Sequence, residues 1–269
     1  MPTRTVRALK RTWGVRDYIV ASVRRDFVAR YLGTQLGVFW ALAQPLAMIA
    51  IFTLVFAEVM RPSLPGHTSR WAYSIYLFAG IAVWQLFSEI MNRSVGVFIH
   101  NANLLKKVSL PKFALPVIVG LSCLVNFAIL LAAFFGFLAI VGALPGAAAM
   151  LSIVPAVIVV VALALGLGVL LGIINVFYRD VEQSTGLVLS FWFWLTPIVY
   201  PVRTVPDWLA AVLAWNPLWP IVRFVQTLFL ERTIPDWHTL VYPATVAVVF
   251  IALGLHAFLR LGGEIVDEL

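Results

Sequence analysis

The titratable side chains of this chain are few and widely spaced, which limits the chemistry they could perform. Its 269 residues include four histidines, one cysteine and twelve carboxylic acids. The sequence has no His-Glu-x-x-His zinc pattern, no Gly-x-x-x-x-Gly-Lys-Ser/Thr phosphate loop and no Gly-x-Ser-x-Gly nucleophile turn. Glu58 and Glu89 are the acids nearest to apolar segments, and we expect both near segment ends. Metal, hydrolytic and nucleotide chemistry are therefore not expected within this chain.

Aromatic side chains offer the clearest binding potential in the sequence. A flat ring can contact the C–H face of a sugar ring without fixing one orientation, which suits a polymer that must slide. The same rings could instead pack the core or form an aromatic belt at a membrane surface. The run Phe-Trp-Phe-Trp at 191–194 points in all directions on a helix, so only some of its rings can face a channel. The candidate channel residues are Phe39, Trp40, Trp84, Phe87, Trp192, Trp194 and Tyr200.

These aromatic residues lie in or beside long apolar segments that are separated by short polar breaks. A helix needs about 20 apolar residues to cross the hydrocarbon core of a bilayer, which is roughly 30 Å thick. Five of six apolar runs reach that length, and 186–200 is shorter. With 12% charged residues and a mean hydropathy of +0.98, the sequence predicts an all-α integral membrane protein with six spans. The runs are 36–57, 71–91, 113–141, 151–177, 186–200 and 239–259.

Positive charge is concentrated on one side of these six runs. Residues 1–35 carry eight Lys and Arg residues and 92–112 carry four, and Arg179 and Arg260 lie on the same side. Five lie on the opposite side. Positively charged loops stay in the cytoplasm, so both termini are expected inside. The net charge of +7 is thus interpreted as an orientation signal with anionic-lipid contact, and nucleic acid is not expected as a partner.

Two short-range patterns predict how the helices begin and pack. Residues 6–28 place Val6, Leu9, Trp13, Val20, Val23 and Phe27 at helical spacing opposite arginines, which predicts an amphipathic helix in the cytoplasmic interface. Gly33 and Gly37 are four apart, as are Gly168 and Gly172, and such spacing lets helix backbones approach closely. No cleavable leader is expected, since the first apolar run begins only near residue 36.

The polar breaks themselves contain three segments of interest. In 92–112, Asn103 could cap a short helix that Pro111 would end. Apolar residues follow Asn103 although this segment is expected to be exposed to water. The turn at 175–182 carries two acids and one arginine. Residues 201–238 are rich in Pro and Trp and could form short helices at 206–214 and 218–231, broken at Asn216-Pro217, that dip into the outer leaflet without crossing it.

Three stretches read together resemble the membrane subunits of type-two ABC exporters, in the branch that moves O-antigen, capsule and teichoic acid. They are RRDFVARYLGTQLGVFWALAQPLAMIAIFTLVF at 24–56, NANLLKKVSLPKFALP at 101–116, and the long stretch from NVFYRDVEQ to VQTLFL at 175–230. The resemblance covers nearly the whole chain in order. The tail LGGEIVDEL follows the usual pattern only loosely.

The resemblance implies one transmembrane domain over 1–269, with a cytoplasmic region at 1–35, a six-span bundle at 36–260 and a cytoplasmic tail at 261–269. It implies a homodimer in the bacterial inner membrane and two copies of a cytoplasmic ABC ATPase, which would bind ATP and Mg²⁺. It also implies that 101–111 is the coupling helix and that 201–231 forms an external gate. The ATPase-coupling residues would be Asn103, Leu104, Leu105, Lys106, Lys107, Val108, Ser109, Leu110, Pro111, Tyr178, Arg179 and Asp180. The gate residues would be Trp208, Trp215, Asn216, Pro217 and Trp219.

The function expected from these features is ATP-driven export of a lipid-linked polysaccharide through a channel at the dimer interface. The chain itself would be a permease subunit and not an enzyme. Two alternatives remain open. A type-two ABC permease for a small drug, lipid or ion would use the same fold with a narrower path. A membrane scaffold or lipid scramblase would not be coupled to ATP.

Overall fold

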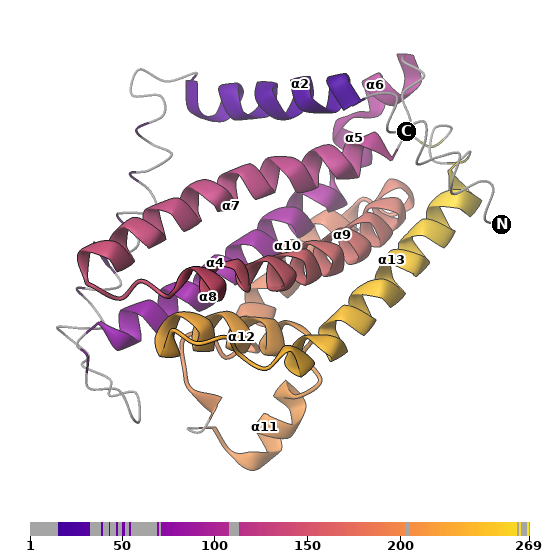
Figure 1. Ribbon diagram of the computed structural model, residues 1–269. Helices are drawn as coiled ribbons and strands as arrows, with labels where there is room; N and C mark the ends of the chain where they lie inside the picture. Colours follow the sequence, from indigo (N-terminus) through magenta and orange to yellow (C-terminus); the bar gives the residue numbers. More distant parts are fainter. Residues whose placement is uncertain are drawn as a thin grey trace.

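The computed structural model describes residues 16–32, 71–107, 113–202 and 205–262, with isolated positions at 39, 43, 47, 50, 51, 54, 69, 264 and 268. Every element in these residues is a helix. Four long helices run side by side through the molecule (Figure 1): α4 (Ala72–Val95), α7 (Ala114–Ile140), α9 (Ile153–Phe177) and α13 (Val241–Leu261). A short helix α8 (Ala147–Leu151) directly precedes α9. These elements confirm four of the predicted apolar segments.

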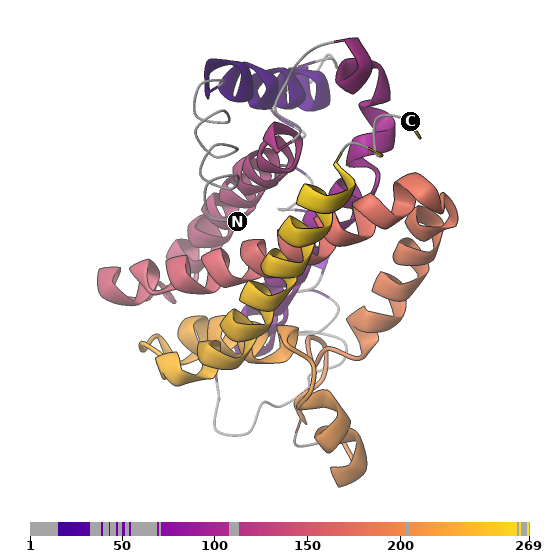
Figure 2. The same ribbon diagram turned by 90° about the vertical axis from the view of Figure 1, so that its right-hand side faces the viewer.

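Shorter helices close the two ends of this bundle. At one end lie α2 (Arg16–Phe27) with the π-turn η1 (Val28–Leu32), α5 (Val97–His100), α6 (Ala102–Lys107) and the end of α13 (Figure 1). We call this the α2 end. At the opposite end, the α11 end, α12 (Leu218–Glu231) and the 3₁₀ turn η4 (Trp237–Leu240) lead into α13, and α11 (Asp207–Leu213) projects away from the bundle (Figure 2).

The helices long and apolar enough to cross a membrane number four among the described residues, or five if the bent pair α11–α12 counts as one span. The first predicted span, 36–57, falls almost wholly outside the described residues. The short predicted span 186–200 corresponds to α10 (Asp180–Trp194). That helix begins six residues earlier than the apolar run and ends at Trp194, because the residue before Pro197 is disfavoured in helical conformation. The expectation of helix up to residue 200 is therefore wrong.

The two short helices predicted in the Pro-rich segment are confirmed. They are α11 and α12, they meet at a bend of 98°, and the break contains Asn216 and Pro217. Aromatic contacts pack α12 against α4 and α7. The ring of Phe134 stacks on Phe78 at 4.5 Å between centroids and meets Phe229 edge-on at 4.9 Å, so one ring of α7 joins α4 to α12.

The small-residue spacing in α9 produces the predicted close packing. A Cβ atom at Gly168 would lie 2.6 Å from the Cβ of Ser94, and one at Gly172 would lie 2.6 Å from the Ser94 carbonyl oxygen. The backbones of α9 and α4 are therefore in direct contact, which only glycine permits at these two positions. Gly33 and Gly37 lie outside the described residues.

The N-terminal helix α2 packs one face against α7, and residues 1–15 lie outside the described part of the chain. Its buried residue is Ile19, with Val23 and Phe27 half-buried one and two turns later. Val20, which was expected on the apolar face, is 66% exposed because Ile19 takes the position that points at α7. The described part of the predicted segment, residues 16–27, is helical; Val23 and Phe27 lie on its packed face as expected, whereas Val20 does not.

Candidate transport pathway

Helix α10 has two different faces, and this difference organises the candidate site. Leu189 is buried, and Trp192 and Phe193 pack inward on α4: Trp192 meets Phe87 at 5.2 Å between ring centroids, and Phe193 meets Trp84 at 5.5 Å. The outward face carries the aromatic and apolar side chains Leu187, Phe191 and Trp194, each 64% exposed.

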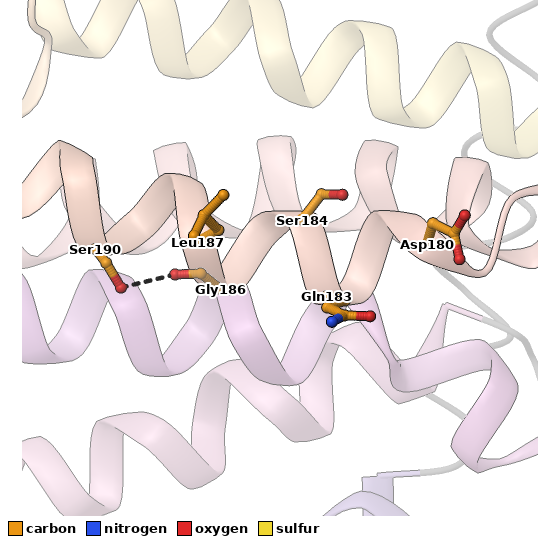
Figure 3. Close-up of a pocket in the computed structure, with 6 residues that line it drawn as sticks. All are labelled: Asp180, Gln183, Ser184, Gly186, Leu187 and Ser190. Carbon is orange, nitrogen blue, oxygen red and sulfur yellow. Dashed lines mark hydrogen bonds between the residues drawn. The ribbon is translucent and has the colours of Figure 1, made fainter.

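The outward face also carries polar side chains, which cluster toward the α2 end of the helix. An open groove lies along this helix, and Figure 3 shows the six α10 residues that line it. The groove has a volume of about 530 Å³ and is lined by Asp180, Gln183, Ser184, Gly186, Leu187 and Ser190. The Ser190 hydroxyl donates to the Gly186 carbonyl oxygen at 3.0 Å, so that hydroxyl is partly satisfied by its own helix. Within the described residues, α10 alone lines the groove.

The structure divides the candidate channel residues into inward and outward groups. Phe87 has no exposed surface and Trp192 packs on it, so both contribute to the contact between α4 and α10. Trp84 and Tyr200 are half-buried. Phe39 is 62% exposed and Trp194 is 64% exposed, whereas Trp40 lies outside the described residues. Phe191 was absent from the candidate channel list and shares the exposed face with Trp194.

Non-helical backbone follows α10, and side chains donate hydrogen bonds to several carbonyl oxygens here and at the end of the helix. Tyr200 Oη donates to the Trp194 carbonyl at 2.6 Å, Gln226 Nε2 to Ile198 at 3.3 Å, Tyr73 Oη to Val199 at 2.5 Å and Tyr76 Oη to Tyr200 at 3.4 Å. At about 1.5 Å per residue, the 15 residues of α10 are shorter than the roughly 30 Å hydrocarbon core of a bilayer. The non-helical segment after α10 therefore continues the chain through the membrane. Irregular backbone at such a depth persists only where its polar groups are satisfied.

Asn216 is the hub that connects this segment to the predicted gate. Its side chain accepts from Trp192 Nε1 and from the Leu218 backbone N–H, both at 3.0 Å, and donates to the Leu195 carbonyl at 3.1 Å and the Thr196 hydroxyl at 2.9 Å. One amide therefore joins α10, the segment after it and the start of α12.

The other predicted gate residues differ in how far they are exposed. Trp208 and Trp215 are 70% and 80% exposed, Pro217 and Trp219 are half-buried, and the Trp215 carbonyl accepts from Tyr242 Oη at 2.8 Å. The exposed indoles project from α11 and the turn that follows it.

At the α2 end, the predicted coupling residues lie on α6 and on the turn before α10. Asn103 and Lys106 are exposed, Leu104 is half-buried, and Leu105 is 8% exposed within the core. Helix α6 begins at Ala102, and the Asn101 carbonyl accepts from the backbone N–H groups of residues 104 and 105, so the prediction that Asn103 caps this helix is wrong.

The remaining predicted coupling residues are distributed between the surface and the undescribed part of the chain. Tyr178 is 70% exposed and Arg179 and Asp180 are also exposed. The side chain of Lys107 and the residues Val108, Ser109, Leu110 and Pro111 lie outside the described part of the chain.

A charged cluster near this end was not anticipated as a unit, although Glu89 stood out in the sequence. Arg30 Nη1 donates to Glu89 Oε1 at 2.8 Å, Asn126 Nδ2 donates to the same oxygen at 2.7 Å, and Arg93 Nη2 donates to Asp26 Oδ2 at 2.8 Å. Burial lowers the pKa of Arg30, but the hydrogen bond and charge of Glu89 outweigh this and raise it overall. The cluster ties α2 and η1 to α4 and α7. The sequence feature that could have indicated this cluster is Asn126, a lone amide within the apolar run 113–141.

Comparison with known proteins places this arrangement in a family. Residues 18–230 match the ABC-2 type transporter family, and the chain belongs to that family. It is a multi-pass protein of the bacterial inner membrane. The chain is 29% identical over 248 residues to the O-antigen export system permease protein RfbA of Myxococcus xanthus, covering 91% of this chain and 93% of that protein.

Two further relatives carry related names. The O-antigen export system permease protein RfbA of Klebsiella pneumoniae is 26% identical over 91% of this chain and 92% of its own length. The polysialic acid transport protein KpsM of Escherichia coli is 24% identical over 86% of this chain and 89% of its own length. The chain is thus similar to these transport proteins along nearly its whole length.

Proposed function

We propose that this chain is the permease subunit of an ATP-driven exporter that moves a lipid-linked, O-antigen-like polysaccharide across the inner membrane. The relatives' names supply the substrate class, since three of them are O-antigen export or polysialic acid transport proteins. The proposed bundle has six spans with both termini cytoplasmic, and the α2 end faces the cytoplasm. The single domain covers the whole chain.

The observation that carries this proposal is the outward face of α10. Gln183, Ser184 and Ser190 occupy the same exposed face as two aromatic rings, on a helix of a membrane protein. Polar groups are costly against lipid, so this face is expected to line water or protein. Hydroxyl and amide groups can hydrogen-bond sugar hydroxyls, and the rings can contact sugar C–H faces.

A second copy of the chain would complete the path. The groove on α10 is lined from one helix only among the described residues, so a channel needs an opposite wall. We assign that wall to the α10 of a second subunit in a two-fold homodimer, an arrangement in which the same surface serves both partners. The outward residues Phe39, Phe191 and Trp194 are the ones expected to contact the polymer, and Phe87 and Trp192 support them from behind.

Energy would come from two ATPase subunits, which would hold ATP and Mg²⁺ themselves. Their docking surface on this chain is proposed to combine α6 and the turn at 178–180. Asn103 and Lys106 are the exposed residues of α6 suited to test it, because a charge at buried Leu105 would also damage packing.

The first experiment is affinity purification of the tagged chain from its native membrane, with mass spectrometry of the proteins that accompany it. A stoichiometric subunit with a phosphate-binding Walker loop is the expected result. A chain that stays folded and supports surface polysaccharide without any such subunit would refute the ATP-driven mechanism.

The second experiment tests the path itself with matched variants. Trp194→Ala, on the outward face of α10, is expected to reduce surface polysaccharide strongly without lowering the amount of protein in the membrane. Leu253→Ala on α13, where the side chain is 48% exposed, is the control and should leave export unchanged. Equal export in both variants would contradict the assignment of the α10 face.

A further inference from the structure

The last turn of α9 holds a buried amide that connects the two proposed docking segments. Asn175 is 0% exposed. Its Nδ2 donates to the Val95 carbonyl at 3.2 Å and lies 3.3 Å from Glu182 Oε2, and its Oδ1 accepts from the Glu182 backbone N–H at 3.0 Å. The Glu182 carboxylate in turn lies 3.3 Å from His100 Nε2. We call Asn175, Glu182 and His100 with the Val95 carbonyl the Asn175 cluster.

The cluster lies where the ends of α4, α5 and α9 meet the start of α10. Val95 is the last residue of α4, His100 ends α5 immediately before α6, and Glu182 lies in the first turn of α10. A buried amide is costly unless its polar atoms are paired. Here those pairs come from α4 and from α10, so Asn175 is satisfied only while both hold their positions against α9.

Close contacts surround the Asn175 cluster. A Cβ atom at Gly96 would lie 2.5 Å from His100 Cε1 and 2.7 Å from Glu182 Oε1, and one at Gly172 would lie 2.6 Å from the Ser94 carbonyl oxygen. The His100–Glu182 pair therefore sits directly on the backbone between α4 and α5. The buried contact between α9 and α4 is packed interior of the kind that transmits displacement, whereas the His100 and Glu182 side chains are 64% and 39% exposed.

We propose that Asn175 and Glu182 are positioning residues that make α5–α6 and the first turn of α10 move as one unit. A push on α6 by a nucleotide-binding partner would then reach the wall of the transport path through Glu182. The inference rests on the proposed function for the source of that push, but the mechanical link itself is a property of this chain.

The link can be tested without any partner. Cys123, the single cysteine, has no exposed surface, so cysteines introduced at the exposed positions Asn103 and Gln183 can carry spin labels selectively. In nanodiscs, with the doubly labelled chain diluted in unlabelled chain so that few dimers carry four labels, the unaltered cluster should give one narrow distance distribution between the two labels of a subunit. Asn175→Ala should broaden it. The control Asn101→Ala, which removes only a local bond to the Val97 carbonyl, should leave it narrow.

The unlabelled variants then test the consequence in the native membrane. Asn175→Ala should leave protein amount and ATPase co-purification unchanged, while export per ATP hydrolysed falls by at least about fivefold, the lower end of energetic coupling between sites. Asn101→Ala should keep the ratio. If Asn175→Ala does not accumulate, Glu182→Ala removes the bridge from a part-exposed side chain and serves in its place.

The outcomes separate the two proposals. If Asn175→Ala and Glu182→Ala both leave the label distance distribution and the export per ATP hydrolysed unchanged, the inference is overturned. If no ATPase accompanies the chain, the proposed function fails, while the label distances still decide whether the two segments move together.

Discussion

Replacing Gly166 with alanine tests a close backbone contact between α9 and α13. A Cβ atom at Gly166 in α9 would lie 2.7 Å from the Ile251 nitrogen and 2.9 Å from the Phe250 carbonyl carbon in α13. The contact is reciprocal, since a Cβ atom at Gly254 would lie 3.0 Å from the Gly166 carbonyl oxygen. Backbone atoms cannot swing aside as a flexible side chain can. The two helices must therefore separate to admit the methyl group.

The size of the effect follows from that separation. Ordinary van der Waals contact begins at 3.4 Å, so the nearest pair must open by about 0.7 Å. A gap of 0.5–1 Å forfeits roughly a quarter to a half of each dispersion contact along the seam. Overpacking of this kind costs about 1–3 kcal/mol. Gly136 in α7 is the matched control, because a Cβ atom there would meet nothing within 4 Å.

Both substitutions exchange glycine for alanine within a long helix, so the gain in helix propensity cancels between them. The free energy of unfolding should therefore be about 1–3 kcal/mol lower for Gly166→Ala than for Gly136→Ala. Equilibrium unfolding in mixed micelles, followed by tryptophan fluorescence at increasing denaturing detergent, measures this difference. Equal stability of the two variants would refute the contact between α9 and α13 as described.

Three further predictions concern two polar contacts and one left-handed backbone position. Glu89→Ala should lower the free energy of unfolding by roughly 2 kcal/mol, below the cost of breaking a fully buried pair because the Arg30 side chain is 42% exposed. An unchanged free energy of unfolding would contradict the ion pair. Asn216→Ala removes four hydrogen bonds and should lower the free energy of unfolding by about 2–3 kcal/mol in the same assay. The control Ser190→Ala removes one exposed hydrogen bond and should lower it by less than about 0.5 kcal/mol. Similar losses in the two variants would contradict the role of Asn216 in joining these segments. Arg232→Gly should raise thermal stability by up to about 1 kcal/mol, because Arg232 ends α12 at a φ of 58°; a lower melting temperature would contradict this.

The sequence by itself determined where most helices lie and where one of them breaks. Long apolar runs must satisfy their backbone within a single helix, so 71–91 and 113–141 predicted α4 and α7 before any packing was known. The Asn216-Pro217 break between α11 and α12 was also predictable from local sequence, because proline disfavours helical conformation in the residue before it. The spacing of Gly168 and Gly172 predicted a close helix contact, although not that Ser94 of α4 would fill it.

Only the tertiary structure decided which side chains are available for function. Four consecutive aromatic residues at 191–194 carry no periodicity, so packing on α4 alone turned Trp192 inward and left Trp194 exposed. Leu104 and Leu105 are identical in type, yet Leu105 is the one in the core. Asn175 and Glu182 are seven residues apart across a turn. The carbonyl that pairs with Asn175 belongs to Val95, 80 residues earlier, and no local pattern specifies such a contact.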